Sequence, residues 1–421
     1  MSAGRRLLAH STVSIVDQAW LSLLNMTVGL ILIRETTQQE YGGYSQLFAA
    51  GLLAVTIAES VVSNPLTTLG STLDRPERDA AVGNLAAFHL RVSTAVAVVV
   101  GAVVAPIVLG AEPSVVALAA GFSLYAFVTL RRELQRTIGF LDGRPVRVLA
   151  GDVLYGAALV GCVVGLSATG HLDLPVLMVV MALAGAVPVL LGNRLSALPR
   201  DPASYRARRA YAIRRGRLGL PGAVSSWLVN FSYLYVAAAM LGTAASAELN
   251  ASRLLLVPIS LSVVAWSRVA RPMTGRLLAD RDHRTLRRLM AASVAGLALV
   301  ALVYAGLVLP LVPWLERHVL GSEYRDVDAL VIWWAVYFAV YAIRWAGATA
   351  LLSADAYPQL LTSALAGLAI LVVALPAAVA MFGVRGAIIG LIVSEVLNLI
   401  LVWGLFLPRV LWPRPTTTDD H

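Results

Sequence analysis

Lysine is absent from this chain of 421 residues, so all 33 basic residues are arginine. The absence excludes a Gly-rich phosphate loop followed by a lysine, and with it an ATP-driven pump within this chain. Cysteine occurs once, as Cys162, which excludes an internal disulfide and a zinc or iron–sulfur site built from cysteines. A His-Glu-x-x-His pair is also missing. We therefore expect no enzyme activity, no cofactor and no metal site.

Charge is scarce as well, at 14% of residues, whereas 58% are hydrophobic and the mean hydropathy is +0.77. This balance holds along the whole length, which excludes a soluble globular chain and predicts an all-α polytopic membrane protein. The apolar runs are too long for the alternating strands of a β-barrel. Windows of about 20 apolar residues predict about twelve transmembrane helices. The predicted segments are 11–33, 44–70, 85–109, 114–136, 148–169, 174–193, 219–241, 246–275, 289–314, 327–353, 358–382 and 384–407.

The arginines lie mostly on one side of the predicted membrane. On that side lie Arg5, Arg6, Arg75, Arg78, Arg131, Arg132, Arg136, Arg144, Arg147, eight from Arg194 to Arg217, five from Arg276 to Arg288, Arg409 and Arg414. The opposite loops hold only Arg34, Arg317, Arg325 and Arg385. The positive-inside rule then predicts that both termini are cytoplasmic. The net charge of +9 indicates topology and contact with anionic membrane lipids, not nucleic acid. The first apolar run has no small-residue cleavage site, so we expect it to stay as helix one.

A polar stripe runs along the first predicted helix. It consists of Ser14, Asp17, Gln18, Ser22 and Asn25, which a helical period gathers on one face. Lipid offers these groups no hydrogen-bond partner, so the stripe must face other helices or a hydrated cavity. It could serve helix packing alone, since Ser and Asn often join helices. A carboxylate such as Asp17 is harder to explain in that way.

The second half of the chain repeats features of the first. Asn64-Pro65-Leu66-Thr67 and Arg271-Pro272-Met273-Thr274 share Pro and Thr at a constant offset, which also matches Gln46 with Arg253. A basic connector that carries Pro199 and Pro202 separates the halves. We expect two six-helix lobes with a substrate path between them. The predicted divisions are an N-lobe of helices 1–6 at 1–198, a cytoplasmic connector at 199–217, a C-lobe of helices 7–12 at 218–408 and a cytoplasmic tail at 409–421.

Charged and aromatic side chains inside the predicted helices are the candidate site residues. A buried arginine costs at least ~2.5 kcal/mol on the insertion scale, so Arg91, Arg253 and Arg344 should each have a partner or a ligand. The acids available as partners are Asp17, Glu59, Asp152 and Glu395. Some of these pairs could be purely structural. Asp17 and Glu59 could instead carry a coupling H⁺ or Na⁺, because burial raises a carboxyl pKa into a range where it titrates.

One face of the tenth predicted helix combines three aromatic rings with a cation. Trp334, Tyr337, Tyr341 and Arg344 follow one another at steps of three, four and three. Such a face suits a sugar and an anionic group, although aromatic residues at helical spacing also serve packing. Asn25 in helix one and Asn230 in helix seven complete the candidate substrate-binding set, because Ser225 to Asn230 matches Ala19 to Asn25.

The opening of the chain resembles a known family. Ser14-Ile-Val-Asp17-Gln18-Ala, Ser22, Asn25, Gly29, Arg34 and Glu40-Tyr41-Gly42-Gly43-Tyr44 resemble polysaccharide-transporter (Wzx-like) flippases of the multidrug/oligosaccharidyl-lipid/polysaccharide (MOP) exporter superfamily. Arg131-Arg132-Glu133, Arg136 and Gly143-Arg144-Pro145 resemble the end of the fourth helix in those proteins. Glu35-Thr36-Thr37-Gln38 departs from the apolar-glycine turn common there. The resemblance extends over all twelve segments and rests on loose motifs.

The resemblance implies two six-helix lobes of the MOP/MATE type that work by alternating access. It implies export of a polyprenyl-pyrophosphate-linked oligosaccharide from the inner to the outer leaflet of a bacterial inner membrane, for cell-surface polysaccharide synthesis. Two alternatives remain. A cation-coupled multidrug antiporter of the same superfamily would favour an acidic cavity, whereas arginines 91, 253 and 344 suit an anion. A membrane glycosyltransferase or polymerase would need a long outer loop with catalytic acids, and the longest predicted one, from Leu315 to Asp326, is short.

Overall fold

The computed structural model describes residues 3–70, 72–110, 112–192, 199–321, 324 and 327–411, with the side chains of 3–11 and 319 outside the description. Several residues used in the topology prediction, among them Arg194, Arg325, Arg414 and the side chains of Arg5 and Arg6, lie outside the described part. So does the tail from 412.

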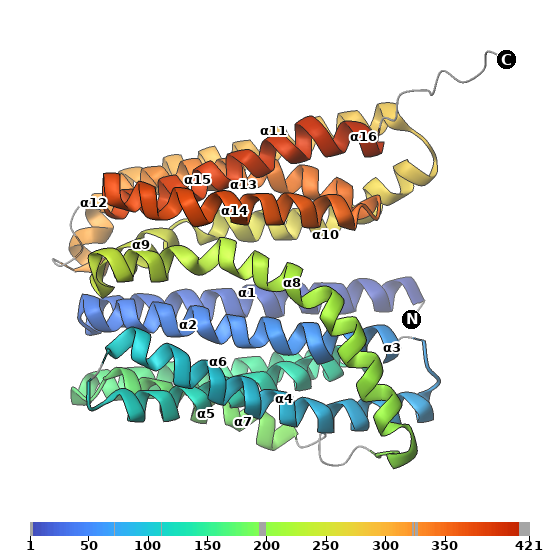
Figure 1. Cartoon of the computed structure of the whole chain (residues 1–421), viewed down its shortest axis with the longest axis horizontal. Coiled ribbons are helices and arrows are strands. Elements are labelled where there is room, and N and C mark those ends of the chain that lie inside the picture. Colours follow the sequence, from blue (N-terminus) through green and yellow to red (C-terminus); the bar gives the residue numbers. More distant parts are fainter. Residues whose placement is uncertain are drawn as a thin grey trace. The chain divides into compact units, whose positions relative to one another are not determined.

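Helices make up nearly all of the described chain, as Figure 1 shows. The first half consists of α1 (Ala3–Glu35), α2 (Gln38–Ala58), η1 (Glu59–Ser63), α3 (Asn64–Gly70), α4 (Arg75–Leu109), α5 (Val115–Leu141), α6 (Pro145–Thr169) and α7 (Leu174–Gly192). The second consists of α8 (Pro202–Leu241), α9 (Thr243–Leu254), α10 (Val257–Ala279), α11 (His283–Val308), η2 (Leu309–Leu311), α12 (Val312–Leu315), η3 (Glu316–Leu320), α13 (Val327–Ser353), α14 (Tyr357–Phe382), α15 (Val384–Ile400), η4 (Leu401–Phe406) and α16 (Leu407–Leu411).

Eleven helical spans in the described ranges are long and apolar enough to cross a membrane, and the bent pair α9 and α10 gives a twelfth. This confirms the prediction of an all-α multi-pass membrane protein. The prediction was most accurate for α13, whose bounds equal the predicted 327–353. Several spans extend beyond the predicted segments, because their helical backbone continues past the apolar stretch. They include the span of α2 to α3, α4, α5, α8, the span that begins with α11 and the span that ends with α16.

The chain forms two compact units, Met1–Trp227 and Leu228–His421. The spans from α1 to α7 belong to the first, where α2, η1 and α3 make one span. The division falls within α8, so this span is shared, and the spans after it belong to the second unit. Residues 202–217 of the predicted basic connector are the first turns of α8. The lobe and connector boundaries drawn from the sequence stay predictions.

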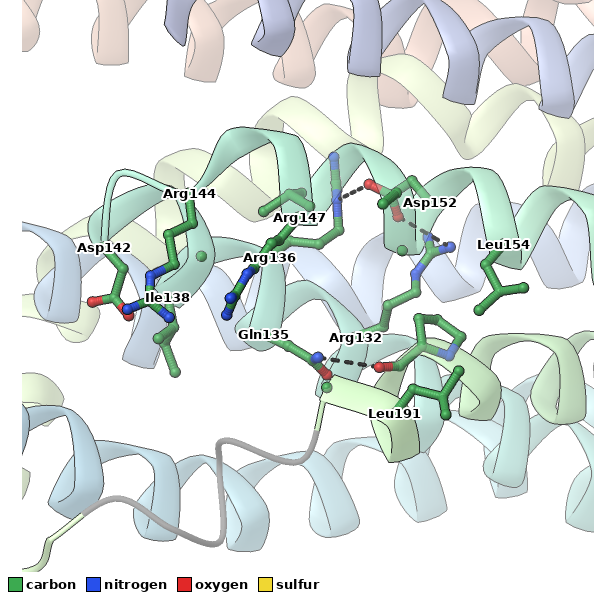
Figure 2. A pocket seen from close by; sticks show the side chains of 16 residues that line it. Arg132, Gln135, Arg136, Ile138, Asp142, Arg144, Arg147, Asp152, Leu154 and Leu191 are labelled. Carbon is green, nitrogen blue, oxygen red and sulfur yellow. Dashed lines mark hydrogen bonds and ion pairs between the residues drawn. The ribbon is translucent and has the colours of Figure 1, made fainter. Parts of the chain in front are cut away.

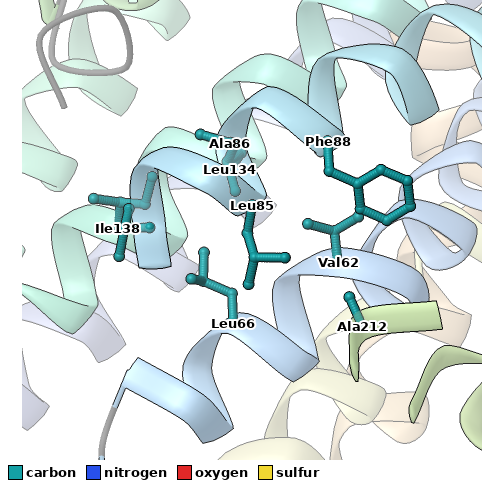
Figure 3. Close-up of a cluster of buried hydrophobic side chains, with 9 residues drawn as sticks. Val62, Leu66, Leu85, Ala86, Phe88, Leu134, Ile138 and Ala212 are labelled. Atoms are coloured by element: carbon teal, nitrogen blue, oxygen red, sulfur yellow. The ribbon is translucent and has the colours of Figure 1, made fainter. Parts of the chain in front are cut away.

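The basic start of α8 packs onto the first unit through an apolar face. Ala212 is fully buried in a cluster with Val62, Leu66 and Leu85, which Figure 3 shows. Gly216 faces Val61 so closely that an added Cβ would lie 2.8 Å from the Val61 Cα. The alternation of small residues with arginines therefore explains how this segment joins the unit while its arginines stay outside.

The second span of each unit is interrupted, but at different points. In the first unit, the π-helical turn η1 ends at Ser63, two residues before Pro65, whose missing N–H loosens the helix there. In the second, α9 and α10 meet at a bend of 54°, although the sequence indicated one helix over 246–275. Pro258, in the first turn of α10, accounts for this break. Its counterpart in the first unit, by the offset of the repeat, is Gly51.

Candidate functional site

A network of five charged side chains, three buried and two half-buried, lies in the first unit. Arg136 on α5 donates from Nε to Asp152 Oδ2 at 2.8 Å, from Nη1 to Glu133 Oε2 at 2.6 Å and from Nη2 to Asp17 Oδ2 at 2.9 Å. Arg132, one turn earlier on α5, lies 3.3 Å from Glu133 and 3.8 Å from Asp152. Its guanidinium carbon also stands 3.8 Å from the ring centroid of Tyr155. We call these five charged residues the α5 network.

The local sequence explains how α1 and α6 reach the α5 network. Gly156 on α6 leaves room for the Trp20 ring, because a Cβ there would lie 2.8 Å from the ring. The Trp20 indole N–H donates to the Asp152 carbonyl at 2.9 Å, which fixes α1 against α6. Asp17 lies nearly one helical turn before Trp20, so it meets Arg136 on the same face. Asp17 and Asp152 are each 1% exposed.

The charges of the α5 network do not cancel. Asp17, Glu133 and Asp152 face two arginines, and the Asp17 Oδ1 atom is buried without a hydrogen-bond partner. Glu59, exposed at the start of η1, is close enough to interact electrostatically with Glu133 and Arg136. The region therefore carries more negative than positive charge. An excess carboxylate of this kind can hold a proton or a small cation.

A pocket of about 410 Å³ adjoins the α5 network and is shown in Figure 2. Residues of α5, α6 and α7 line it, together with the turn between α5 and α6. Gln135 donates from Nε2 to the Pro188 carbonyl at 3.1 Å and so links α5 to α7 at its edge. Arg132, Arg136 and Asp152 belong to both the pocket wall and the network.

A second charged cluster lies in the second unit. The Arg344 Nε donates to Glu395 Oε1 at 2.6 Å and joins α13 to α15. Along α13, Tyr337 stacks on Tyr341 at 6.1 Å between ring centroids, and Tyr341 on Trp345 at 5.8 Å. The structure thus brings together the aromatic face and the cation that the sequence placed on one side of this helix.

Arg253 lies next to this face, in the last turn of α9 where the span bends. Its guanidinium carbon is 5.4 to 5.7 Å from the ring centroids of Phe231, Tyr233 and Trp334. Its Nη1 donates to the Tyr233 hydroxyl at 3.2 Å, and its Nε has no hydrogen-bond partner. Within the described residues no carboxylate forms an ion pair with Arg253. The carbonyl end of α9 offers its cation some stabilisation.

The other residues predicted to bind substrate lie outside the α5 network and the contacts of Arg253 and Arg344, or have a packing role. Arg91 is exposed on α4, and its nearest ring is Tyr205 at 5.9 Å, so it is not the buried cation that the sequence indicated. Asn25 is exposed on α1 and Asn230 is half-buried on α8. Trp334 is fully buried, and its indole N–H donates to Ser252 at 3.1 Å, which gives this ring a packing role.

Sequence reasoning missed the α5 network as a unit. It named Asp17 as a coupling residue and Asp152 as a possible partner for Arg91, Arg253 or Arg344. Arg132, Glu133 and Arg136 entered only the topology and the family resemblance. The pattern Arg132-Glu133-x-x-Arg136 near a membrane-helix end was the available signal, because such spacing puts Glu133 and Arg136 in contact. No group of three or more metal-ligating side chains suited to a metal occurs in the part of the chain that the structure describes.

These helices and clusters define a membrane protein with the fold of MOP superfamily transporters. An inward-facing multidrug resistance MATE transporter of that superfamily has a TM-score of 0.72 and 14% identity, over 91% of this chain and 93% of the other. The inward closed lipid II flippase MurJ has a TM-score of 0.69 and 10% identity, over 94% and 86%. A Pyrococcus furiosus MOP transporter, described by the reverse polarity of its binding pocket, has a TM-score of 0.60 and 15% identity, over 94% and 93%.

No protein-family model matches the sequence, and no curated protein sequence matches it. At these identities the structural likeness establishes the fold alone.

Proposed function

We propose that this protein is a flippase that moves a polyprenyl-pyrophosphate-linked oligosaccharide from the inner to the outer leaflet of a bacterial inner membrane by alternating access. The observation that carries the proposal is Arg253, a cation among three aromatic rings with no carboxylate partner in the described chain. A pyrophosphate is an anion that such a guanidinium can bind through charge-assisted hydrogen bonds. One relative in fold, MurJ, is named as a lipid II flippase.

The residues beside Arg253 suit the rest of such a headgroup. Tyr337, Tyr341 and Trp345 offer a row of ring faces, and sugars pack on flat aromatic surfaces. Arg344 adds a second cation that Glu395 holds in place. The cluster around Arg253 and Arg344 thus combines two guanidinium groups with one carboxylate, an excess of positive charge that favours an anionic substrate.

Export of lipid-linked sugar tests the proposal. Arg253→Ala and the Arg253→Ala/Arg344→Ala double variant should accumulate lipid-linked oligosaccharide in the inner leaflet. Loss of one charge-assisted contact of about 1.5–3 kcal/mol corresponds to roughly a tenfold or greater fall in rate. Arg385→Ala, an exposed arginine at the start of α15, is the matched control and should export normally at equal protein level. Normal export by the double variant would refute an arginine site for the headgroup.

One observation favours a second candidate, a cation-coupled multidrug antiporter. The α5 network and Glu59 give the first unit an acidic excess, which suits a cationic drug or a coupling H⁺ or Na⁺. Asp17→Asn separates the two functions. If the protein is an antiporter, this change should abolish cation-driven drug efflux, while Arg253→Ala should leave efflux intact. If it is a flippase coupled to an ion at Asp17, both changes should reduce lipid-linked sugar export.

A further inference from the structure

The pocket beside the α5 network has an uneven charge distribution. Four arginines and two aspartates line it, at positions 132, 136, 144, 147, 142 and 152. Arg132 and Arg136 are already occupied by the acids of the α5 network, and Asp142 lies 3.8 Å from Arg78 on α4. The two other arginines, Arg144 and Arg147, have no acidic partner in the described ranges. The end of the pocket at the turn between α5 and α6, which we call its mouth, therefore has two arginines, Arg144 and Arg147, against one aspartate, Asp142.

The backbone at this mouth adds to the positive potential. Arg144 is the N-cap residue of α6, and Pro145 and Arg147 lie in its first turn. Pro145 has no N–H and the Arg147 N–H donates to the Arg144 carbonyl at 3.1 Å, so it is the positive end of the α6 dipole that favours an anion here. Figure 2 shows Arg144 and Arg147 on the same side of the pocket, away from Leu154 and Leu191. The charged and the apolar parts of the lining are thus separated along the pocket.

The apolar part suits a hydrocarbon chain. Leu191 on α7 is 74% exposed and Leu154 on α6 is 39% exposed, and both line the pocket. Val146, in the first turn of α6, is 65% exposed. Exposed leucine and valine on spans of this type face the hydrocarbon of the bilayer. A lipid whose anionic group binds the two arginines would therefore have its hydrocarbon tail beside these apolar side chains.

We propose that this pocket binds the phosphate group of a membrane lipid, with Arg144 and Arg147 as its anion ligands and Leu154 and Leu191 beside its tail. The shared chemistry is a phosphate or pyrophosphate on a long hydrocarbon chain. It has two sources, a bulk anionic phospholipid and a polyprenyl pyrophosphate. The site is independent of Arg253 and of the proposed transport, because it lies wholly within the first unit.

Native mass spectrometry of the full chain in detergent tests the site without a transport assay. The probes are phosphatidic acid, diacylglycerol with the same tails but no phosphate, and polyprenyl pyrophosphate. The Arg144→Gln/Arg147→Gln variant should bind phosphatidic acid about tenfold more weakly and diacylglycerol unchanged. Arg284→Gln/Arg288→Gln is the matched control, because it removes two exposed arginines from α11 and the same net charge.

A second variant fills the pocket and keeps its charges. Ala150 is exposed and lines the pocket, so Ala150→Trp should also weaken phosphatidic acid binding. Equal losses in the Arg144/Arg147 variant and the control variant would mean that surface charge alone binds the lipid, which overturns the proposal. Unchanged binding in the Arg144/Arg147 variant or in Ala150→Trp would overturn it too.

Competition identifies the source of the phosphate. Displacement of phosphatidic acid by polyprenyl pyrophosphate at an equal or lower concentration would support a site that receives the lipid-linked substrate. Failure to displace it, with the losses above intact, would support a site for bulk phospholipid. Neither result depends on Arg253. The tests can therefore reject the flippase function and support this lipid site, or support the flippase function and reject this lipid site.

Discussion

Arg136 is the residue whose loss should do most damage to the first unit. It is the only guanidinium that contacts all three acids of the α5 network, and its side chain is 17% exposed. In Arg136→Gln, Asp17 loses its ion pair and Asp152 keeps only the 3.8 Å contact with Arg132. Breaking a buried ion pair costs about 3–5 kcal/mol, because a charge is left without compensation. We expect Arg136→Gln to lower stability by that amount.

The assay is thermal unfolding in detergent, followed by fluorescence-detected size exclusion. Arg91→Gln is the control, since it removes an exposed arginine of the same unit and should melt like the wild type. Adding Asp17→Asn to Arg136→Gln should restore part of the loss, because it removes the carboxylate left unpaired. Arg136→Lys should rescue incompletely, since an ammonium cannot reach three acids with fork geometry. Wild-type melting of Arg136→Gln, or no rescue by Asp17→Asn, would refute the reasoning.

Two further predictions concern stability. Gly386→Ala should sharply reduce the yield of folded protein, because a Cβ there would collide with the Ala378 backbone carbonyl. Gly161→Ala is the control and should fold normally, because the space around Gly161 is open. A normal yield of Gly386→Ala would contradict the close packing at this position. Asp282 is the N-cap residue of α11. Hydrogen bonds from the Thr285 side chain and from the Thr285 N–H, the latter at 3.0 Å, lower the pKa of its carboxyl. The contribution of the ionised Asp282 carboxylate to the free energy of unfolding should therefore be present above its unfolded pKa of about 3.9. It should be lost as pH falls through the lower pKa of the folded state. Asp282→Asn should keep the N-cap hydrogen bond and remove this acid-dependent fall in melting temperature. If the melting temperature of Asp282→Asn depends on pH as it does in the wild type, this prediction is wrong.

Hydropathy was sufficient to predict the spans, because every segment that crosses a bilayer must satisfy its own backbone hydrogen bonds. It did not predict the break between α9 and α10, since the run over 246–275 stays apolar across Pro258. The signal was present in that proline, but prolines such as Pro106, Pro188 and Pro376 lie inside unbroken helices. Tertiary packing decides which of them interrupts a span.

The candidate site was predictable only in part for a related reason. Glu395 was among the proposed acid partners, and the structure pairs it with Arg344. Periodicity showed which residues share one face of α13, but it could not show which helices lie beside each other. Contact between α1, α5 and α6 joins Asp17 to Arg136 across 119 positions. Arg91 appeared buried from its place in a predicted helix, whereas the orientation of α4 leaves it exposed.

Two glycines of α6, Gly161 and Gly165, suggest close packing by their spacing, yet both are exposed with open space around them. The thiol of Cys162 lies on the same open surface. Because no other residue of the chain carries a thiol, a maleimide-linked spin label or fluorophore would attach at one known position without any engineering. A second cysteine introduced into the second unit would then give a labelled pair that reports the distance between the two units.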